Sequence, residues 1–274
     1  MTSPDVPQLT RHRPGRTRAR VARVVPPLVV GVVGVLAWQL ACTANVFPDT
    51  VSAPGEILRY LWEVLRTSAA WSVIAETMKS WTIGFSITVL LGTVVGAAAG
   101  LSVTGKRLIA GLVEFFRPIP SVIFIPVVVI AFGSGRAGVI LLVVLSAVWP
   151  VLIQTEAGVR DSDPLLWDVA HAYGLTRGQR IRHCVIPATV PFVATGVRIA
   201  ATISLVVVIT VEMLGTGSGI GAEMARALQT GDYDRLYGWA FISATLGFIV
   251  DTLLGKVENK VLRWHPSVRA EVRA

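Results

Sequence analysis

Long apolar stretches are the feature that most limits what this chain can fold into. Crossing the hydrocarbon core of a membrane takes about 20 helical residues. The 274-residue chain is 53 % hydrophobic, with a mean hydropathy of +0.64, and holds several windows of that length. Five are clear, at residues 24–43, 81–103, 137–154, 191–214 and 237–255, and a weaker sixth at residues 108–132 contains charges and prolines. None alternates with the period of two that barrel strands show. The windows predict an all-α, polytopic membrane protein with about six transmembrane helices.

The excess of Lys and Arg is explained better by membrane topology than by nucleic-acid binding. The chain has a net charge of +8, with 25 Lys and Arg against 17 Asp and Glu. Most of these cations lie in residues 11–23, 106–107, 160–182 and 256–273, and few lie in the segments on the other side of the windows. Cytoplasmic loops of membrane proteins carry such an excess. We therefore predict a multi-pass protein of the cytoplasmic (inner) membrane, in contact with the lipid bilayer, with both termini in the cytoplasm and no nucleic-acid partner.

Composition divides the chain into tails and transmembrane parts. The expected parts are a disordered basic cytoplasmic tail (residues 1–23), the first transmembrane helix (24–45), an outer amphipathic segment (46–76), the main transmembrane domain (77–262) and a cytoplasmic tail (263–274). In the amphipathic segment, a helix is expected to start at Ser52-Ala53-Pro54 with Ser52 as its N-cap. Residues 215–235 are expected to form a Gly-rich outer loop with a short helix. Gly92, Gly96 and Gly100, each four residues apart, predict close helix packing.

Residues 155–187 form a polar loop with more punctuation than a simple connection needs. Asp163 and Pro164 indicate a helix start, because Asp caps free amides and Pro tolerates the first helical position. Gly174 suits a left-handed helix stop, and Thr176 can cap a second short helix that ends, or passes into the next window, at Pro187. The apolar residues that share one face of the first helix are Leu165, Leu166, Val169, Ala170 and Tyr173. The residues that flank the exposed turn are Asp168, His171 and Arg177. Such a rigid knob suggests force transmission to a partner.

The same loop resembles a known signature. Asp168-Val169-Ala170 is followed by three residues, Gly174, nine residues and then Cys184-Val185-Ile186-Pro187. The permease signature of binding-protein-dependent ABC importers runs Glu-Ala-Ala, x3, Gly, x9, Ile-x-Leu-Pro. The chain keeps this spacing together with Ala170, Gly174 and Pro187, and has Asp for Glu, Val for the first Ala, Cys for Ile and Ile for Leu. It therefore resembles the inner-membrane permeases of these importers, over roughly residues 46–265.

Further segments resemble the nitrate/sulfonate/taurine branch of that family. They are Phe47-Pro48, Ser52 to Glu56, Arg117-Pro118-Ile119-Pro120, Pro187 to Pro191 with Gly196-Val197-Arg198, and Glu212 to Gly215 with Ser218 to Gly221. The resemblance implies a transport subunit that hydrolyses nothing itself, holds no cofactor and passes a small anionic nutrient similar to a sulfonate, nitrate or taurine. The implied partners are two cytoplasmic ABC ATPase subunits, an extracytoplasmic substrate-binding protein and a second permease copy in a homodimer.

In the family this loop docks into a groove on the ATPase. The resemblance therefore implies that residues of the loop couple the chain to that partner. The implied ATPase-coupling residues are Asp163, Pro164, Leu166, Asp168, Val169, Ala170, His171, Tyr173, Gly174, Arg177, Ile186 and Pro187.

Four residues in the apolar windows are candidates for the translocation path: Arg117, Pro120, Arg198 and Glu212. A charge at the bilayer centre costs about 2.5–3.5 kcal/mol on insertion scales, so such residues usually face the bundle or a cavity. Arg117, beside Pro118 and Pro120, suggests a broken helix whose freed backbone groups line a cavity. Arg198 and Glu212 are about four helical turns apart, so each needs another partner. Alternatively, the two arginines extend to the cytoplasmic interface.

Other classes of function fit the sequence less well. An ion-gradient-driven secondary transporter would carry membrane-embedded carboxylates and inverted repeats, and Glu212 is the one clear carboxylate of this kind. An intramembrane enzyme would need a convergent polar set, yet all the histidines lie outside the windows, namely His12, His171, His183 and His265. The run Gly100 to Arg107 approaches a phosphate-binding loop, but Arg107 replaces the hydroxyl residue that would hold magnesium. The sequence predicts no catalytic residue, metal site or nucleotide site.

Overall fold

The computed structural model describes residues 16–116, 119–132, 135–161, 169–170, 172–215 and 218–263. Within these residues the chain is built from helices, without strands. In chain order they are α1 (Arg16–Thr43), α2 (Pro54–Val64), α3 (Ser68–Gly100), α4 (Val103–Phe116), the 3-10 helix η1 (Ser121–Phe124), α5 (Ile125–Phe132), α6 (Arg136–Arg160), α8 (Arg177–Arg180), the π-helix η2 (Ile181–Val185), α9 (Ile186–Gly215), α10 (Ile220–Thr230) and α11 (Tyr233–Val261). The predicted all-α class is confirmed.

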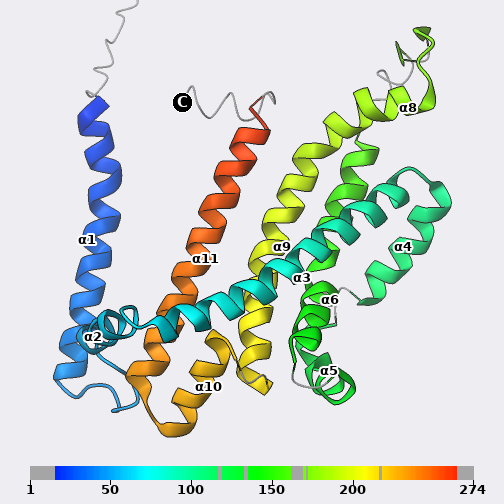
Figure 1. Ribbon diagram of the computed structural model, residues 1–274. Helices are drawn as coiled ribbons and strands as arrows, with labels where there is room; N and C mark the ends of the chain where they lie inside the picture. Colours follow the sequence, from blue (N-terminus) through cyan, green and yellow to red (C-terminus); the bar gives the residue numbers. More distant parts are fainter. Residues whose placement is uncertain are drawn as a thin grey trace, which may run out of the picture. The chain divides into compact units, whose positions relative to one another are not determined.

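The chain divides into two compact units, residues 1–59 and 60–274. The first contains α1 and the start of α2, which are tied together where Gly55 N donates a hydrogen bond of 2.9 Å to Gln39 Oε1. The second unit contains the end of α2 and the remaining helices, including the loop and the cavities considered below (Figure 1).

The start of α2 differs by one residue from the prediction. The helix begins at Pro54, so Ala53 rather than Ser52 occupies the preceding position. Alanine has no side-chain acceptor for the free amides at the helix start. Instead, a side chain inside the helix accepts a hydrogen bond from the backbone of Ala53. The carboxylate of Glu56 accepts a hydrogen bond of 3.0 Å from the backbone N–H of Ala53. This is the reciprocal half of a capping box.

Four described helices are long and apolar enough to cross a membrane: α3, α6, the continuous helix from Arg177 to Gly215, and α11. The 28-residue α1 covers the first predicted window. The weak window at residues 108–132 is instead divided into α4, η1 and α5, and Pro120 lies at the break. Because proline cannot donate to the helix ladder and clashes with the preceding turn, it favours such an interruption. The polytopic prediction is confirmed, with one span broken.

Of the two alternatives predicted for Pro187, the structure shows the second, because the short helix does not end there and passes into the next window. α8, η2 and α9 continue as one helix of 39 residues from Arg177 to Gly215. In the π-helical turn the Ile186 N–H donates to Ile181 O, five residues earlier. Such a turn relaxes the ladder immediately before Pro187, so the proline is accommodated inside the helix.

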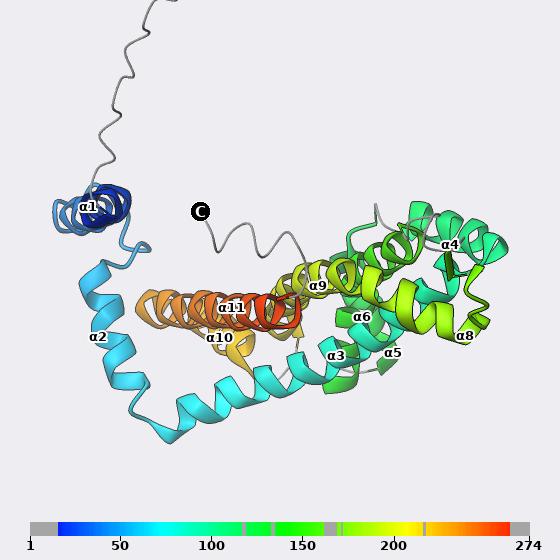
Figure 2. The ribbon, with the colours of Figure 1, turned by 90° about the horizontal axis from the view of Figure 1, so that it is seen from above.

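The core of the second unit lies where α3, α6 and α9 pack side by side (Figures 1 and 2). Trp81 is at its centre: the indole N–H donates a hydrogen bond of 2.9 Å to Ser204 Oγ, and the ring stacks on Phe85 with centroids 5.0 Å apart. The fully buried apolar residues around it include Leu142, Val143 and Val208. The buried indole is therefore satisfied by α9 while its ring fills the interface.

Glycines let α3 approach α6 closely. A Cβ added to Gly92 would lie 2.7 Å from Val151 Cβ, and one added to Gly96 would lie 2.5 Å from the backbone oxygen of Leu152. Gly100 is equally crowded by α6. Side-chain carbons do not approach other atoms this closely, so only glycine allows the observed helix separation. The close packing predicted from the four-residue spacing is confirmed.

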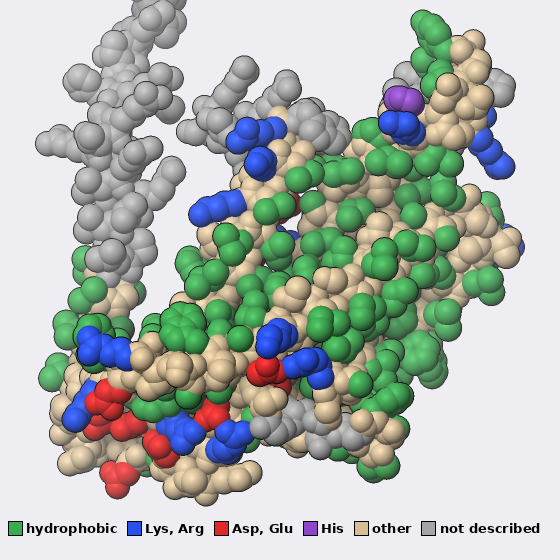
Figure 3. Space-filling view, in the orientation of Figure 1, with side chains coloured by type: hydrophobic (Ala, Val, Ile, Leu, Met, Phe, Trp, Pro, Cys, Tyr) green, Lys and Arg blue, Asp and Glu red, His purple; other side chains and the backbone are tan. Residues whose placement is uncertain are grey.

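Many hydrophobic side chains lie on the face of the helices seen in Figure 3. Exposed large side chains on the spanning helices include Leu90, Val94, Val206, Phe248 and Leu253, of which Phe248 is 73 % exposed. A soluble protein rarely exposes so much contiguous apolar area. Lipid tails can cover this surface in a membrane, which agrees with the length and composition of the helices.

Candidate coupling loop and translocation path

The described part of the 155–187 loop contains a helix stop at Gly174. Gly174 has φ +69°, the left-handed conformation that glycine adopts at little cost. The amides on either side close the preceding turn: Tyr173 N donates to Val169 O and Leu175 N donates to Ala170 O, both at 3.0 Å. The chain therefore turns away from the preceding helix at the residue predicted for the stop.

A helix start follows two residues later. Thr176 Oγ1 accepts a hydrogen bond of 3.4 Å from Gln179 N, and Gln179 Oε1 accepts one of 2.8 Å from Thr176 N. These two bonds form a complete capping box. The predicted cap of the second helix is confirmed, and it fixes the direction in which α8 leaves the turn.

The turn presents an aromatic side chain to its surroundings. Tyr173 is 82 % exposed and Val169 is 44 % exposed, whereas Ala170 is buried. Arg177 and Ile186 are also exposed. A surface with an exposed aromatic ring, aliphatic groups and a cation has the composition of a protein contact site.

Several predicted loop residues lie outside the described part of the chain. They are Asp163, Pro164, Leu166, Asp168 and His171. Pro187 is described and lies partly buried at the start of α9. The coupling role of the whole set stays a prediction.

A cavity of about 500 Å³ lies among α3, α6, η2, α9 and α11. Its lining is mostly aliphatic, and its polar members are Thr93, Thr155, Thr189, Arg198 and Glu258. Ile181 and Val185 of the π-helical turn also line it. The cavity therefore starts next to the polar loop and extends along α9.

Arg198 is the cation of this cavity, and it is not free. Its Nε and Nη2 atoms donate to the two carboxylate oxygens of Asp251 at 2.8 and 3.0 Å. Its Nη1 atom lies 3.6 Å from Glu258 Oε2. The predicted need for a partner other than Glu212 is confirmed, and α11 supplies that partner. Asp251, a charged residue in the last apolar window, and Glu258 were not among the predicted path residues.

Glu212 occupies a different place. It is 3 % exposed, and its Oε2 atom accepts hydrogen bonds from Thr77 Oγ1 at 2.8 Å and from Gly221 N at 3.2 Å. Thr77 Oγ1 in turn accepts a bond of 2.8 Å from Ile220 N. The carboxylate therefore joins α3, α9 and the first amides of α10. It is not among the lining residues of the cavities described here.

The glycines before α10 make room for this carboxylate. Gly219 has φ +111°, and a Cβ there would overlap the carboxylate group of Glu212. A Cβ on Gly221 would overlap the backbone of α9. The Gly-rich run that follows Glu212 is thus required by contact with α9, and the predicted short helix in residues 215–235 is α10.

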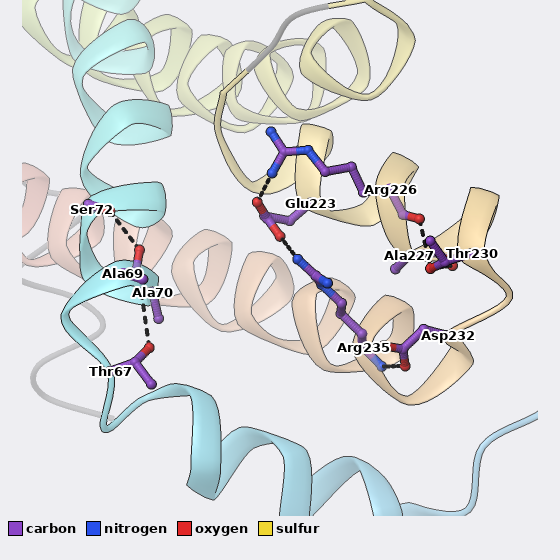
Figure 4. Close-up of polar contacts among 10 residues, drawn as sticks. All are labelled: Thr67, Ala69, Ala70, Ser72, Glu223, Arg226, Ala227, Thr230, Asp232 and Arg235. Atoms are coloured by element: carbon purple, nitrogen blue, oxygen red, sulfur yellow. Dashed lines mark hydrogen bonds and ion pairs between the residues drawn. The ribbon is translucent and has the colours of Figure 1, made fainter.

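Glu223 ties α10 to α11 (Figure 4). Its carboxylate accepts from Arg226 on one oxygen and from Arg235 on the other. Asp232 Oδ1 caps α11 by accepting a hydrogen bond of 3.1 Å from Arg235 N. Figure 4 also shows Thr67, which caps the start of α3. The contact between Glu223 and Arg235 joins two helices, so local sequence spacing does not predict it.

Pro120 lines a second cavity of about 310 Å³, together with Phe116 and Trp149. The rings of Phe116 and Trp149 stack with centroids 5.8 Å apart. Arg117 lies outside the described residues. The helix break predicted from the neighbouring prolines is confirmed, and a cavity does adjoin it. Among the described residues no group of three or more His, Cys, Asp or Glu side chains could hold a metal ion.

Comparison with known proteins places this geometry in a family. Residues 88–263 match the family described as the binding-protein-dependent transport system inner membrane component. The permease protein SsuC of Escherichia coli, named for aliphatic sulfonates transport, is 31 % identical over 88 % of this chain and 91 % of its own length. The nitrate import permease protein NrtB of Leptolyngbya laminosa is 24 % identical over 88 % of this chain and 89 % of its own.

Solved structures agree at the level of the fold. A chain from the crystal structure of an amino acid ABC transporter with histidines superposes with a TM-score of 0.59, covering 78 % of this chain and 99 % of its own. At 17 % identity, this likeness concerns the helix arrangement alone.

The family match covers more than half of the chain, and SsuC exceeds 30 % identity over most of it. Permeases of this kind are multi-pass transport components of the inner membrane, without catalytic activity of their own, that work with separate ATPase and substrate-binding subunits. The chain therefore belongs to the binding-protein-dependent inner membrane components, as an ABC importer permease of the nitrate/sulfonate/taurine branch.

Proposed function

We propose that this permease forms a homodimer that passes a small oxyanion nutrient, and that its 155–187 loop is driven by two cytoplasmic ATPase subunits. The names of its relatives support the substrate class, since nitrate and aliphatic sulfonates both spread one negative charge over several oxygens. Binding of the nutrient on the outer side belongs to the separate binding protein, so the permease has to admit the ion, hold it briefly and release it inside.

The observation that carries the coupling role is the turn at Gly174. Tyr173 is 82 % exposed on a turn that Gly174 and the Thr176 capping box hold in one conformation. A flexible connection would suffice to join two spans, and it would have no reason to expose an aromatic ring. The turn leads directly into the 39-residue helix that lines the cavity of about 500 Å³. A movement of the turn is therefore transmitted along this helix to the proposed translocation path.

The candidate residues of the path take different roles in this proposal. Arg198 contacts the passing ion, and Pro120 maintains the helix break next to the second cavity, with Arg117, close to it in the sequence, as a further candidate. Glu212 positions α10 against α3 and α9.

The proposed topology has both termini in the cytoplasm, which the positive-inside bias supports. The proposed parts of the chain are the two tails (1–23 and 263–274), the first helix (24–45), the outer segment (46–76) and the permease domain (77–262).

The experiment is uptake of a labelled oxyanion into vesicles that contain the full assembly, with ATP enclosed in the lumen and binding protein outside. Proline fixes φ near −65°, whereas Gly174 has φ +69°. We expect Gly174→Pro to insert normally and to lose at least about tenfold of the ATP-driven uptake. A Gly174→Pro variant with full uptake contradicts the coupling role.

Gly178 provides the matched control. No described atom lies within 4 Å of a Cβ built on Gly174 or on Gly178, but only Gly174 has a positive φ. Gly178→Ala should therefore keep wild-type uptake, and Gly174→Ala should fall between wild type and Gly174→Pro. Uptake by vesicles that lack the ATPase subunits would instead support an ion-gradient-driven transporter.

A further inference from the structure

The guanidinium of Arg198 lies beside two carboxylates, although one carboxylate would balance its charge. Asp251 occupies the Nε and Nη2 edge of the guanidinium at 2.8 and 3.0 Å, and Glu258 lies 3.6 Å from Nη1. The ionised trio has a formal net charge of one negative unit. Such a cluster does not attract an anion from a distance. An anion can use the Nε and Nη2 edge of Arg198 only by replacing Asp251.

The cluster lies where two cavities meet. Arg198 and Glu258 line the cavity of about 500 Å³ among α3, α6, α9 and α11. Asp251 lines a third cavity, of about 380 Å³, between α9 and α11. Because Asp251 is hydrogen-bonded to Arg198, the ion pair forms part of the boundary between the two spaces. Apart from this cluster, most side chains around both cavities are aliphatic.

The geometry of the Arg198–Asp251 pair selects one kind of ligand. A guanidinium presents parallel N–H donors whose spacing matches two oxygens of one carboxylate. Nitrate and sulfonate present oxygen pairs of the same kind, whereas chloride presents a single sphere. Asp251 is therefore an internal oxyanion, held on the edge that a transported oxyanion would use.

We propose that Asp251 occupies this edge of Arg198 between transport events and that the transported oxyanion displaces it, so that Arg198 determines specificity for oxyanions. This inference rests on the proposed function. Glu258 stays beside the guanidinium while the ion is bound, and its negative charge weakens the complex. A transport path needs contacts strong enough to admit an ion and weak enough to release it. The exchange of Asp251 for substrate, opposed by Glu258, meets both needs.

The alternative is a purely structural tie between α9 and α11. The two readings differ in the effect of removing Asp251. If the pair is only structural, the isosteric Asp251→Asn change weakens the tie, and any gain in anion affinity comes from the lost negative charge alone, so chloride would share it and Arg198→Lys would keep it. If Asp251 instead competes with substrate, the same change frees the Nε and Nη2 edge and strengthens anion binding.

The test measures equilibrium binding of [35S]ethanesulfonate to the purified permease–ATPase complex without binding protein, at constant ionic strength. We expect Asp251→Asn to bind at least about fivefold more tightly than wild type. Arg198→Lys in the Asp251→Asn background keeps the charge but loses the paired donors, and should remove this gain. Unlabelled nitrate should compete for the site, and chloride should not.

Arg136 is the matched control, because it forms an ion pair with Glu76 between α6 and α3 and lines none of the cavities described here. Arg136→Lys should leave binding unchanged. Unchanged or weaker binding in Asp251→Asn, equal competition by chloride, or an Arg136→Lys effect of the same size would each overturn the proposal. ATP-driven uptake by the wild-type assembly is measured in parallel: its absence counts against the proposed function, whereas normal uptake without the Asp251→Asn gain counts against this inference alone.

Discussion

Two glycines with positive φ differ in what surrounds them, so adding a Cβ should cost different amounts of stability at the two positions. Gly219 has φ +111° and Gly231 has φ +71°, so both lie in the region that favours glycine. We expect Gly231→Ala to lower the unfolding free energy by about 1–2 kcal/mol, the usual cost of a left-handed residue. Gly219→Ala should lower it further, because the new Cβ also displaces the Glu212 carboxylate. Thermal unfolding in detergent measures both variants, and equal melting temperatures would contradict this account.

Two threonines whose hydroxyl oxygens are buried provide a second comparison at this scale. Thr77 Oγ1 donates to Glu212 and accepts from Ile220 N, both at 2.8 Å. Thr93 Oγ1 is buried without a hydrogen-bond partner among the described residues. Valine keeps the shape of threonine and removes the hydroxyl. We expect Thr77→Val to lose about 1–3 kcal/mol of stability, and Thr93→Val to be neutral or slightly stabilising. Denaturant unfolding measures the stability of both variants. A larger loss of stability for Thr93→Val than for Thr77→Val would contradict this account.

Residue pairings were predictable only where they are local. Gly174 and Thr176 could be assigned from the sequence because a helix stop and a cap depend on neighbours within about one turn. The side-chain partner of Glu212 is Thr77, 135 positions away. The cost of burying a charge predicts that a partner exists and does not identify it. The same limit hid the contact of Arg198 with α11.

At the scale of elements, the contact of α3 with α6 sets a testable limit on side-chain size. A Cβ on Gly96 would lie 2.5 Å from a backbone oxygen of α6, whereas one on Gly111 in α4 would meet no described atom within 4 Å. We expect Gly96→Ala to lose about 1–3 kcal/mol, the usual cost of overpacking. Gly111→Ala should gain up to about 1 kcal/mol from reduced chain entropy. Melting temperatures of the two variants should shift in opposite directions.

Helix identities followed from the apolar windows, but helix boundaries did not. α3 begins at Ser68, well before the window at residues 81–103, because Thr67 caps it and the polar residues at its start suit a helix outside the lipid. The helix from Arg177 continues through Pro187 because a π-helical turn changes the backbone pairing before it. Neither effect changes hydrophobic periodicity, so the sequence pattern could not reveal them.

At the scale of the whole molecule, the proposed topology is open to labelling. The free cysteines, Cys42 and Cys184, can both be replaced by serine to give a silent background. In that background we expect Tyr173→Cys to react with a membrane-impermeant maleimide only after the membrane is opened, because the loop faces the cytoplasm. Gln229→Cys, at the exposed end of α10, should react in intact spheroplasts. Reaction of Tyr173→Cys from outside would reverse the orientation.

The unbroken helix from Arg177 to Gly215 has a thermodynamic consequence. At 1.5 Å per residue its 39 residues extend about 58 Å, nearly twice the hydrocarbon thickness of a bilayer. One end leaves the turn at Gly174, and the other carries Glu212, which holds α10. Where a single element joins two binding events, linkage is reciprocal. If the substrate-binding protein docks beside α10, its binding therefore changes the affinity of the ATPase subunits for nucleotide. Nucleotide must then change the affinity of the permease for the binding protein by the same factor.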